Sequence, residues 1–243
     1  MTTSISSLSH QTLAVLGGSS GIGLAVARAA LAEGATVWAA GRDPQRLAEA
    51  AAAAPGLQTA ALDIADPAAL AAFFERIGVL DHLVVTAGAS LAAAPLAGLD
   101  FAAARQAIEV KLIGSLRAAQ QALPHLRADG SIGFTSGMLA RKPTPNALVK
   151  TVINAGLEAA VRQLAKELAP RRVYAVSPGP VDTPGWSFPD AASRAAKFQQ
   201  LGAGLPVGFA ASAEDTAAAY LFAMRARALT GAVIDLDSGA QLS

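Results

Sequence analysis

Hydrophobic residues are distributed along the chain in two alternating patterns. Short apolar runs without regular polar alternation are typical of parallel strands that are buried on both faces. Seven such runs occur, at residues 12–16, 35–40, 57–62, 82–86, 132–136, 172–177 and 233–236. The longer segments between them carry helix-start and helix-stop residues, which predict helices. These are a helix that opens at Pro44 and the segments 24–33, 66–76, 100–123, 146–168 and 214–226.

The order of these elements predicts the fold class. Each connection between consecutive strands is long enough to hold a helix, so we expect the strands to be parallel and doubly wound. We predict an α/β fold, a Rossmann-type three-layer sandwich around a seven-stranded parallel sheet. Residues 1–243 show no linker and are expected to form one domain, with residues 1–10 flexible. Residues 183–212 form a long irregular stretch, which predicts a substrate-binding loop or lid.

Composition excludes several functional classes. Hydrophobic residues make up 53% of the chain and charged residues 15%, a balance that excludes intrinsic disorder. The formal net charge of +1 offers no electrostatic footprint for nucleic acid. The absence of cysteine excludes disulfides, a thiolate nucleophile and a cysteine zinc cluster. His10, His82 and His125 lack metal-ligand spacing, so we expect no metal site.

The high apolar content raises the question of a membrane, since the mean hydropathy is +0.40. No run of about 18 apolar residues is free of Gly, Pro and charge, and the N-terminus lacks the features of a signal peptide. We therefore expect a cytoplasmic protein with no membrane partner. The apolar surplus belongs in a buried sheet or a subunit interface, and we expect a homo-oligomer, with a tetramer favoured over a dimer.

The glycine-rich segment from Gly17 to Gly23 is the strongest chemical signal. It lies between a predicted buried strand and the start of a predicted helix, and this context indicates a dinucleotide-binding turn. Gly17 permits the tight turn, Gly21 lets backbone N–H groups approach a pyrophosphate, and Gly23 lets the helix pack closely on the strand. The positive end of the helix dipole then faces the phosphates. Asp63, after the third predicted strand, either accepts a hydrogen bond from an adenine amine or forms a turn or cap.

Five segments together resemble the short-chain dehydrogenase/reductase superfamily over nearly the whole chain. They are GGSSGIG at residues 17–23, LDI at 62–64, TAG at 86–88, SPGPVDTP at 177–184 and DSG at 237–239. Leu16 and Thr86 depart from the family's Thr and Asn. The resemblance implies nicotinamide-cofactor contacts at Gly17, Ser19, Ser20, Gly21, Ile22, Gly23, Asp63, Ile64, Ala87, Gly88, Pro178, Gly179, Val181 and Thr183.

The end of the second predicted strand determines which cofactor is expected. An acidic residue there binds the ribose 2′-hydroxyl of NAD, whereas a basic one accommodates the 2′-phosphate of NADP. The resemblance puts Gly41 at the acidic position, followed by Arg42, whose guanidinium suits a phosphate. Asp43 argues slightly in the other direction, and a solvated Arg42 is the alternative. We favour NADP(H).

The positions that resemble the family's catalytic residues are all substituted. The family uses a Ser, a Tyr-x-x-x-Lys pair and a helix Asn. The corresponding positions in this chain are Gly137, Lys150, Asn154 and Lys111. Ser136 offers a candidate hydroxyl one residue before the Ser position. Tyr174 and Tyr220 are the only tyrosines, and neither lies near the start of the helix over residues 146–168.

These substitutions suggest a rebuilt site. Asn154 would bind the nicotinamide ribose, Lys111 would restore the missing positive charge behind it, and Lys150 would face the substrate as a general acid and base or as an imine-forming amine. Like-charge repulsion between the two lysines would lower the pKa of one of them. Ser136 would stabilise an oxyanion. The alternative is that Lys150 turns into solvent and the cleft has lost its chemistry.

Three functions remain open at this point. The chain is a redox enzyme that takes hydride from NADPH to a small-molecule substrate, a lyase or isomerase that uses the same cleft, or a catalytically silent NADP(H)-binding protein. The intact cofactor segments favour the first and the third. Trp186 and Phe188 either contact a substrate or pack the loop down. Nearby Asp190, Arg194 and Lys197 are expected on a solvated helix face.

Overall fold

A computed structural model describes residues 7–88, 91–184, 186 and 188–243. In this part of the chain seven strands form one sheet in the order β3-β2-β1-β4-β5-β6-β7, and every neighbouring pair is parallel. The strands are β1 (Thr12–Leu16), β2 (Thr36–Gly41), β3 (Gln58–Ala61), β4 (Leu80–Val85), β5 (Leu126–Thr135), β6 (Arg172–Pro178) and β7 (Val233–Leu236). The predicted fold class is confirmed. The structure does not describe residues 1–6, so the predicted flexibility of residues 1–10 lies outside the described residues there.

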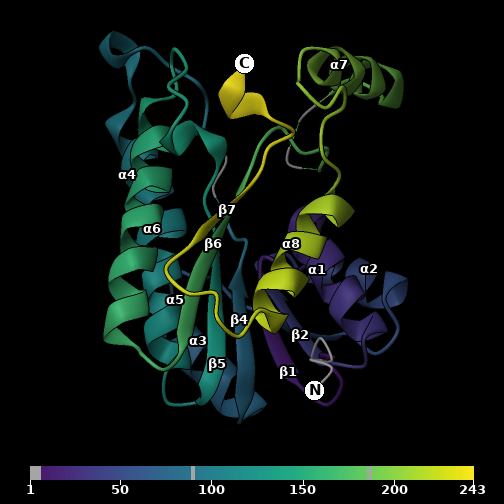
Figure 1. The fold of residues 1–243 in the computed structure, drawn as a ribbon, viewed down its shortest axis with the longest axis vertical. Helices are drawn as coiled ribbons and strands as arrows, with labels where there is room; N and C mark the ends of the chain where they lie inside the picture. The colour runs from purple at the N-terminus through teal and green to yellow at the C-terminus, as the bar shows by residue number, and fades with distance from the viewer. Residues whose placement is uncertain (1–6, 89–90, 185, 187) are drawn as a thin grey trace.

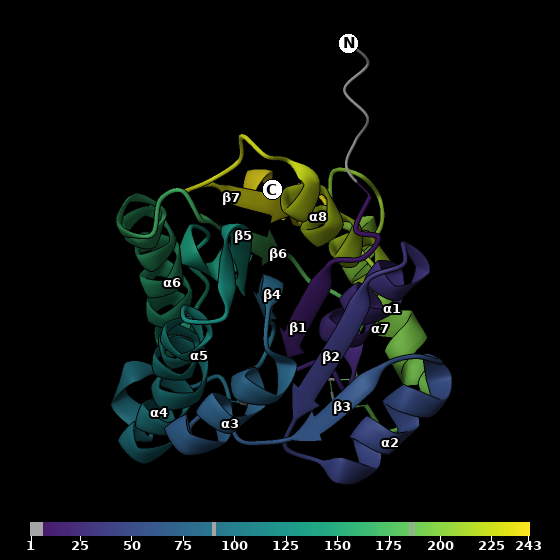
Figure 2. The same cartoon turned by 90° about the horizontal axis from the view of Figure 1, so that it is seen from below.

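Helices cover both faces of the sheet (Figure 1). One face carries α1 (Gly21–Ala32), α2 (Pro44–Ala53) and α8 (Ala213–Arg225). The other carries α3 (Pro67–Ile77), α4 (Phe101–Ile108), α5 (Gly114–Ala122) and α6 (Leu148–Glu167). Figure 2 shows the sheet between these two groups of helices, so the molecule has three layers. Among the described helices, none combines the length and the apolarity needed to cross a membrane.

The side chains of β1 show why its sequence is apolar without a break. Successive strand residues point to opposite faces of a sheet. Leu13 and Val15 pack into the core beneath α1 and α8. Ala14 and Leu16 pack into the core on the other face, with residues of α3, α5 and α6. Both faces of β1 are therefore buried, which explains its continuous apolar run.

The predicted helix over residues 100–123 is interrupted in the structure. α4 ends at Ile108, a π-helical segment (η2) covers Glu109–Ile113, and α5 follows directly. Within this stretch the Ser115 hydroxyl donates to the carbonyl oxygen of Lys111, at 2.6 Å. A π-helical turn inserts an extra residue into a helix and is frequent at functional sites. The predicted helix is therefore confirmed over residues 101–122, with Asp100 as its cap, but the π-helical segment within it was not predicted.

Residues 183–212 are also more regular than the sequence predicted. They contain α7 (Ala191–Ala203), which stands beyond the carboxyl ends of the strands (Figure 1). Asp190 caps this helix by accepting from the backbone N–H of Ser193, at 2.7 Å. The Arg194 guanidinium pairs with Asp182, at 2.5 Å, and so ties α7 to the segment that follows β6. The excursion thus contains one helix, which an ion pair holds to the segment after β6, and its role as a substrate-binding loop or lid stays a prediction.

Candidate active site

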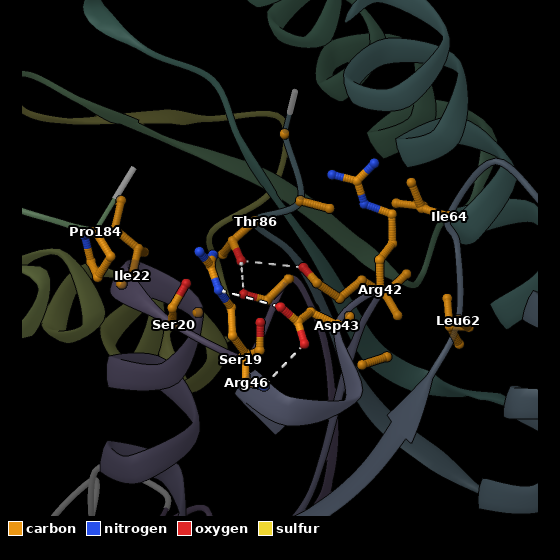
Figure 3. A pocket seen from close by; sticks show the side chains of 18 of the residues that line it. Ser19, Ser20, Ile22, Arg42, Asp43, Arg46, Leu62, Ile64, Thr86 and Pro184 are labelled. Carbon is orange, nitrogen blue, oxygen red and sulfur yellow. Dashed lines mark hydrogen bonds and ion pairs between the residues drawn. The ribbon is translucent and has the colours of Figure 1, made fainter. Parts of the chain in front are cut away.

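A cleft of about 830 Å³ opens at the carboxyl ends of the strands. It lies where the strand order reverses between β1 and β4, which is the usual ligand position in a doubly wound sheet. Figure 3 shows Ser19, Ser20 and Ile22 on one side of it and Leu62 and Ile64 on the other. The remaining lining residues are Leu16, Gly17, Gly21, Gly23, Ala40, Gly41, Arg42, Asp43, Pro44, Arg46, Thr86, Ala87, Gly88, Val110, Thr183 and Pro184.

The glycine turn forms the floor of this cleft. Gly17 has a φ of +89°, and a Cβ atom on Gly23 would lie 2.3 Å from the Gly17 carbonyl oxygen, so both positions require glycine. The Thr86 hydroxyl lies 3.2 Å from the carbonyl oxygens of both Leu16 and Gly17 and donates to them. Thr86 therefore fixes the turn from β4, in the position where the family has Asn.

The start of α1 leaves backbone donors available to an anion. Ser20 is the residue before the first helical position, and its side chain makes no capping hydrogen bond. Backbone N–H groups in the first turn of a helix have no intrahelical acceptor, and the helix dipole adds a positive potential there. The cleft therefore presents unpaired donors at the position that a cofactor pyrophosphate would occupy.

The junction between β2 and α2 provides two arginines. Asp43 caps α2 by accepting from the backbone N–H groups of Gln45 and Arg46, and it pairs with the Arg46 guanidinium at 3.6 Å. In the described part of the chain, no carboxylate forms an ion pair with Arg42. Figure 3 shows Arg42 and Arg46 extending on either side of Asp43. The Asp43 carboxylate, which argued against a 2′-phosphate, is thus occupied in capping α2. Arg46, in the first turn of α2, was not among the residues predicted from the sequence.

Asp63 takes the turn-forming role rather than a place in the cleft. Its Oδ1 atom accepts from the backbone N–H of Ala65, at 2.9 Å. The neighbouring Leu62 and Ile64 line the cleft, but Asp63 does not. Of the two alternatives that the sequence left open for this residue, the structure favours the turn.

The segment after β6 supports the inner wall of the cleft. Thr183 and Pro184 line it, whereas Pro178, Gly179 and Val181 do not. The backbone N–H of Gly179 donates to the Leu236 carbonyl oxygen, and a Cβ atom at Gly179 would lie 2.8 Å from the Cα of Asp237. Gly179 therefore holds this turn closely against β7 and the residue that follows it.

Lys111, Asn154 and the carbonyl group of Ser136 meet near the inner end of the cleft. The Lys111 ammonium donates to Asn154 Oδ1 at 2.8 Å and to the Ser136 carbonyl oxygen at 3.2 Å. An ammonium has only donors, so the oxygen of the Asn154 amide must face Lys111 and its NH₂ group must face away. Val110, the residue before Lys111, lines the cleft, which places this cluster beside it.

Gly137 makes room for the Asn154 amide. A Cβ atom at residue 137 would lie 2.9 Å from Asn154 Nδ2, so a serine there, as in the family, would collide with the amide. Asn154 thus occupies the space of the missing serine side chain. Three of the four substituted positions form one interlocked group in the structure.

The pKa of Lys111 is lowered to about 8. Burial is the main cause, because it disfavours the charged form, and the positive charge of Lys150 acts in the same direction. The sequence predicted that two neighbouring ammonium groups would lower the pKa of one of them, and the affected group is Lys111. Lys150 itself is exposed, in the first turn of α6 and one helical turn before Asn154.

Ser136 does not face the cleft. Its hydroxyl donates to Glu158 Oε1 at 2.9 Å, and the residue is 2% exposed. Glu158 is buried and pairs with the Arg141 guanidinium at 3.2 Å, and Arg141 also pairs with Asp235 of β7. The proposed oxyanion role of Ser136 is therefore corrected, because its hydroxyl is committed to a buried carboxylate. Glu158 was missed, although it follows Asn154 by one helical turn.

The substrate-loop aromatics pack against each other. The Trp186 and Phe188 rings are stacked with centroids 6.4 Å apart, and both meet the Phe198 ring of α7 edge-on. The Trp186 indole N–H donates to the Val181 carbonyl oxygen at 2.9 Å. These contacts favour the loop-packing alternative for both residues, although the Trp186 side chain remains 43% exposed.

Comparison with known proteins gives the family. The family described as Enoyl-(Acyl carrier protein) reductase matches residues 17–241. A short-chain dehydrogenase/reductase from Stachybotrys chlorohalonatus is 33% identical over 248 residues, which cover 96% of this chain and 97% of that protein. The chain belongs to the short-chain dehydrogenase/reductase family. It is accordingly an oxidoreductase of this type, built for a nicotinamide cofactor.

Two further family members are similar over nearly their whole lengths. A small-chain dehydrogenase whose crystal structure is a complex with NADPH is 39% identical, with a TM-score of 0.83, over 96% of this chain and 100% of that one. Cis-4-hydroxycyclohexanecarboxylate dehydrogenase from Sinomonas cyclohexanicum is 34% identical over 93% of this chain and 94% of that protein. In the chain described here, the glycine turn and the arginines at the β2–α2 junction line the cleft at the position where the family binds its nicotinamide cofactor.

Proposed function

We propose that the chain is an NADP(H)-dependent reductase that acts on a carbonyl or imine carbon of a small, largely apolar substrate with a non-standard set of proton donors. The observation that carries the proposal is that the Lys111–Asn154 cluster lies next to Val110, which lines the same cleft as the glycine turn and the two arginines. A bound NADPH would supply the hydride.

The residues of the chain then divide the remaining work. Backbone N–H groups at the start of α1 bind the pyrophosphate, and Arg42 with Arg46 binds the 2′-phosphate. The free NH₂ group of Asn154 is directed to the nicotinamide ribose, with Lys111 supplying positive charge behind it. Lys150 holds the proton that the substrate oxygen or nitrogen receives. Trp186 and Phe188 cover the substrate end as the outer wall of the loop.

The experiment that tests this function is the oxidation of NADPH on incubation with panels of ketones, aldehydes and imines. Turnover with at least one class, abolished in Lys150→Met, is the expected result. The Lys166→Met variant is the matched control, because Lys166 is an exposed lysine at the other end of the same helix. If NADPH binds but no panel member is reduced, the second candidate gains. That candidate is a catalytically silent NADP(H)-binding protein, and the exposure of Lys150 favours it. A lyase or isomerase differs from both, because it would consume its substrate without oxidising NADPH.

We predict that the protein binds NADPH at least tenfold more tightly than NADH. Arg42 has no carboxylate partner among the described residues, and Gly41 leaves space beside Ser19, since a Cβ atom there would lie 3.2 Å from the Ser19 hydroxyl. One charge-assisted contact to a phosphate supplies the required difference of about 1.4 kcal/mol. Fluorescence titration measures both affinities. The assignment fails if they are equal or if Arg42→Ala leaves the preference unchanged.

We also propose a cytoplasmic homo-oligomer, with a tetramer favoured over a dimer. Four large apolar side chains are exposed on the neighbouring segments α4, η2 and α6: Phe101, Ile113, Leu148 and Val152. Burial of such a surface between subunits removes it from water. Light scattering at micromolar concentration should show more than one subunit, and Val152→Glu should lower the mass. The equivalent change at Val207, which is exposed elsewhere, is the control, and a monomeric wild type contradicts the proposal.

A further inference from the structure

A buried carboxylate lies next to the Lys111–Asn154 cluster and has no part in the proposed mechanism. Glu158 follows Asn154 by one helical turn of α6, and the residue is 5% exposed. Burial of a carboxylate is costly, and a well-packed apolar side chain in such a place often stabilises a protein as much or more. The contacts of Glu158 therefore have to show what the acid provides.

Glu158 joins α6 to the end of β5. Its Oε1 atom accepts the hydrogen bond of the Ser136 hydroxyl at 2.9 Å. This hydroxyl also lies 3.3 Å from the Asn154 carbonyl oxygen, but it has one hydrogen, and Glu158 offers the nearer and charged acceptor. Ser136 is itself fixed in the sheet, because its backbone N–H donates to the Val176 carbonyl oxygen at 2.9 Å. The carboxylate thus attaches the helix to a fixed point of the sheet.

The second oxygen of Glu158 joins α6 to the other side of the site. Oε2 pairs with Arg141 Nε at 3.2 Å, and the Arg141 guanidinium also pairs with Asp235 of β7. Arg141 belongs to the connection between β5 and α6. Because residues four apart lie on the same face of a helix, contacts that hold Glu158 from two sides also set the rotation of α6 at Asn154.

That rotation matters because the Asn154 amide makes two contacts at once. Its Oδ1 atom accepts from Lys111 at 2.8 Å, and its Nδ2 atom lies in the space above Gly137, 2.9 Å from where a Cβ atom would be. Ser136 takes part on both sides: its carbonyl oxygen accepts from Lys111 at 3.2 Å, and its hydroxyl binds Glu158. A shift of α6 against β5 would therefore redirect the amide.

We propose that Ser136 and Glu158 are positioning residues, which fix α6 on the sheet so that the free NH₂ group of Asn154 is directed to the nicotinamide ribose. They act through Asn154 and are not themselves in contact with the cofactor. The proposal rests on the proposed function, which assigns the ribose to Asn154, and adds to it the residues that hold Asn154 in place.

The test compares two ligands by titration calorimetry. NADPH reaches the Asn154 end of the cleft, whereas 2′,5′-ADP carries the adenosine and the 2′-phosphate but no nicotinamide ribose. A general loosening of the fold weakens the binding of both ligands. A loss of positioning lowers only the preference for NADPH over 2′,5′-ADP, and Asn154→Ala shows how much of that preference the amide provides.

Two variants remove the tie in different ways. Ser136→Ala deletes the hydroxyl and leaves Glu158 paired with Arg141. Glu158→Gln keeps the shape of the side chain, but its single carbonyl oxygen can accept from Ser136 or from Arg141 and not from both. Each variant should lower the preference for NADPH by about fivefold or more, the loss expected for one hydrogen bond, while the affinity for 2′,5′-ADP stays unchanged.

Two matched controls should keep the wild-type preference. Ser131→Ala removes another buried hydroxyl, earlier in β5, which lies 2.8 Å from Nδ1 of His82. Glu33→Gln removes an acid that pairs with Arg225 at 2.7 Å, at the end of α1 away from the glycine turn.

The outcomes separate this proposal from the proposed function. If Ser136→Ala or Glu158→Gln keeps the preference, or loses affinity for both ligands alike, the positioning role is overturned and the proposed function stands. If Asn154→Ala keeps the preference, the ribose contact is wrong and the positioning role falls with it. If the wild type binds NADPH no more tightly than 2′,5′-ADP, the proposed function falls as well.

Discussion

Replacing Gly23 by alanine is expected to weaken NADPH binding by more than a hundredfold. The added Cβ atom would lie 2.3 Å from the carbonyl oxygen of Gly17 and 2.5 Å from the Thr86 hydroxyl, and neither can move without opening the turn. Thr86 ties that turn to β4, so the strain would pass directly to the backbone groups that face the phosphates. The loss should appear in binding rather than in helix formation, because alanine is a better helix former than glycine.

Fluorescence titration of NADPH measures the effect, and circular dichroism shows whether the variant folds. Gly98→Ala is the matched control: Gly98 does not line the cleft, and a Cβ atom there would lie 3.9 Å from the Pro95 side chain, an ordinary contact. Binding by Gly23→Ala within threefold of the wild type would show that the cofactor does not sit on this turn. A loss in both variants would indicate a general loss of folding instead of a strained turn.

The sequence predicts well what depends on neighbouring residues. The apolar run of β1 indicated a strand buried on both faces, and its residues alternate between the two cores. The segment from Gly17 to Gly23 predicted a turn that only glycine can form, and the conformations of Gly17 and Gly21 bear this out. In each case the chemistry of a few consecutive residues determines the local backbone.

The sequence predicts poorly what depends on contacts between distant residues. Ser136 looked available as a donor, but Glu158, 22 residues later, accepts its hydroxyl. The π-helical segment Glu109–Ile113 was not predicted, because the segment 100–123 was interpreted as one α-helix. Arg194 lies on the exposed helix face that the sequence predicted, but its pairing with Asp182, 12 residues earlier, was not predicted.

The substituted catalytic positions illustrate the same limit. Read along the chain, Lys111, Gly137 and Asn154 are three separate departures from the family pattern. In the structure the amide of Asn154 binds Lys111 on one side and fills the space above Gly137 on the other. The three positions are therefore expected to behave as a unit in mutational cycles.

The second large effect is expected from the pH dependence of stability, and it concerns Lys111. The pKa of this lysine is about 8 in the folded protein, against 10.5 when unfolded. Below pH 8 the folded and the unfolded protein both hold the Lys111 proton, so this group does not make the free energy of unfolding depend on pH. Between pH 8 and 10.5 only the unfolded state binds it, and the free energy of unfolding must therefore rise with pH, by up to about 1.4 kcal/mol per unit.

Lys111→Met removes this contribution. Between pH 7.5 and 10.5 the free energy of unfolding of the wild type should therefore rise by about 3 kcal/mol relative to that of the variant. At pH 7 the variant escapes the cost of burying a charge but leaves the Asn154 and Ser136 oxygens without a donor, and these effects partly cancel. The pH slope of the difference is thus more informative than stability at any single pH. Urea unfolding of both proteins across this range measures it, with Lys166→Met as the control whose curve should stay parallel to the wild type. Parallel curves for Lys111→Met as well would mean that Lys111 is not a desolvated cation, and the positive charge that the proposed proton-donor set requires would be missing.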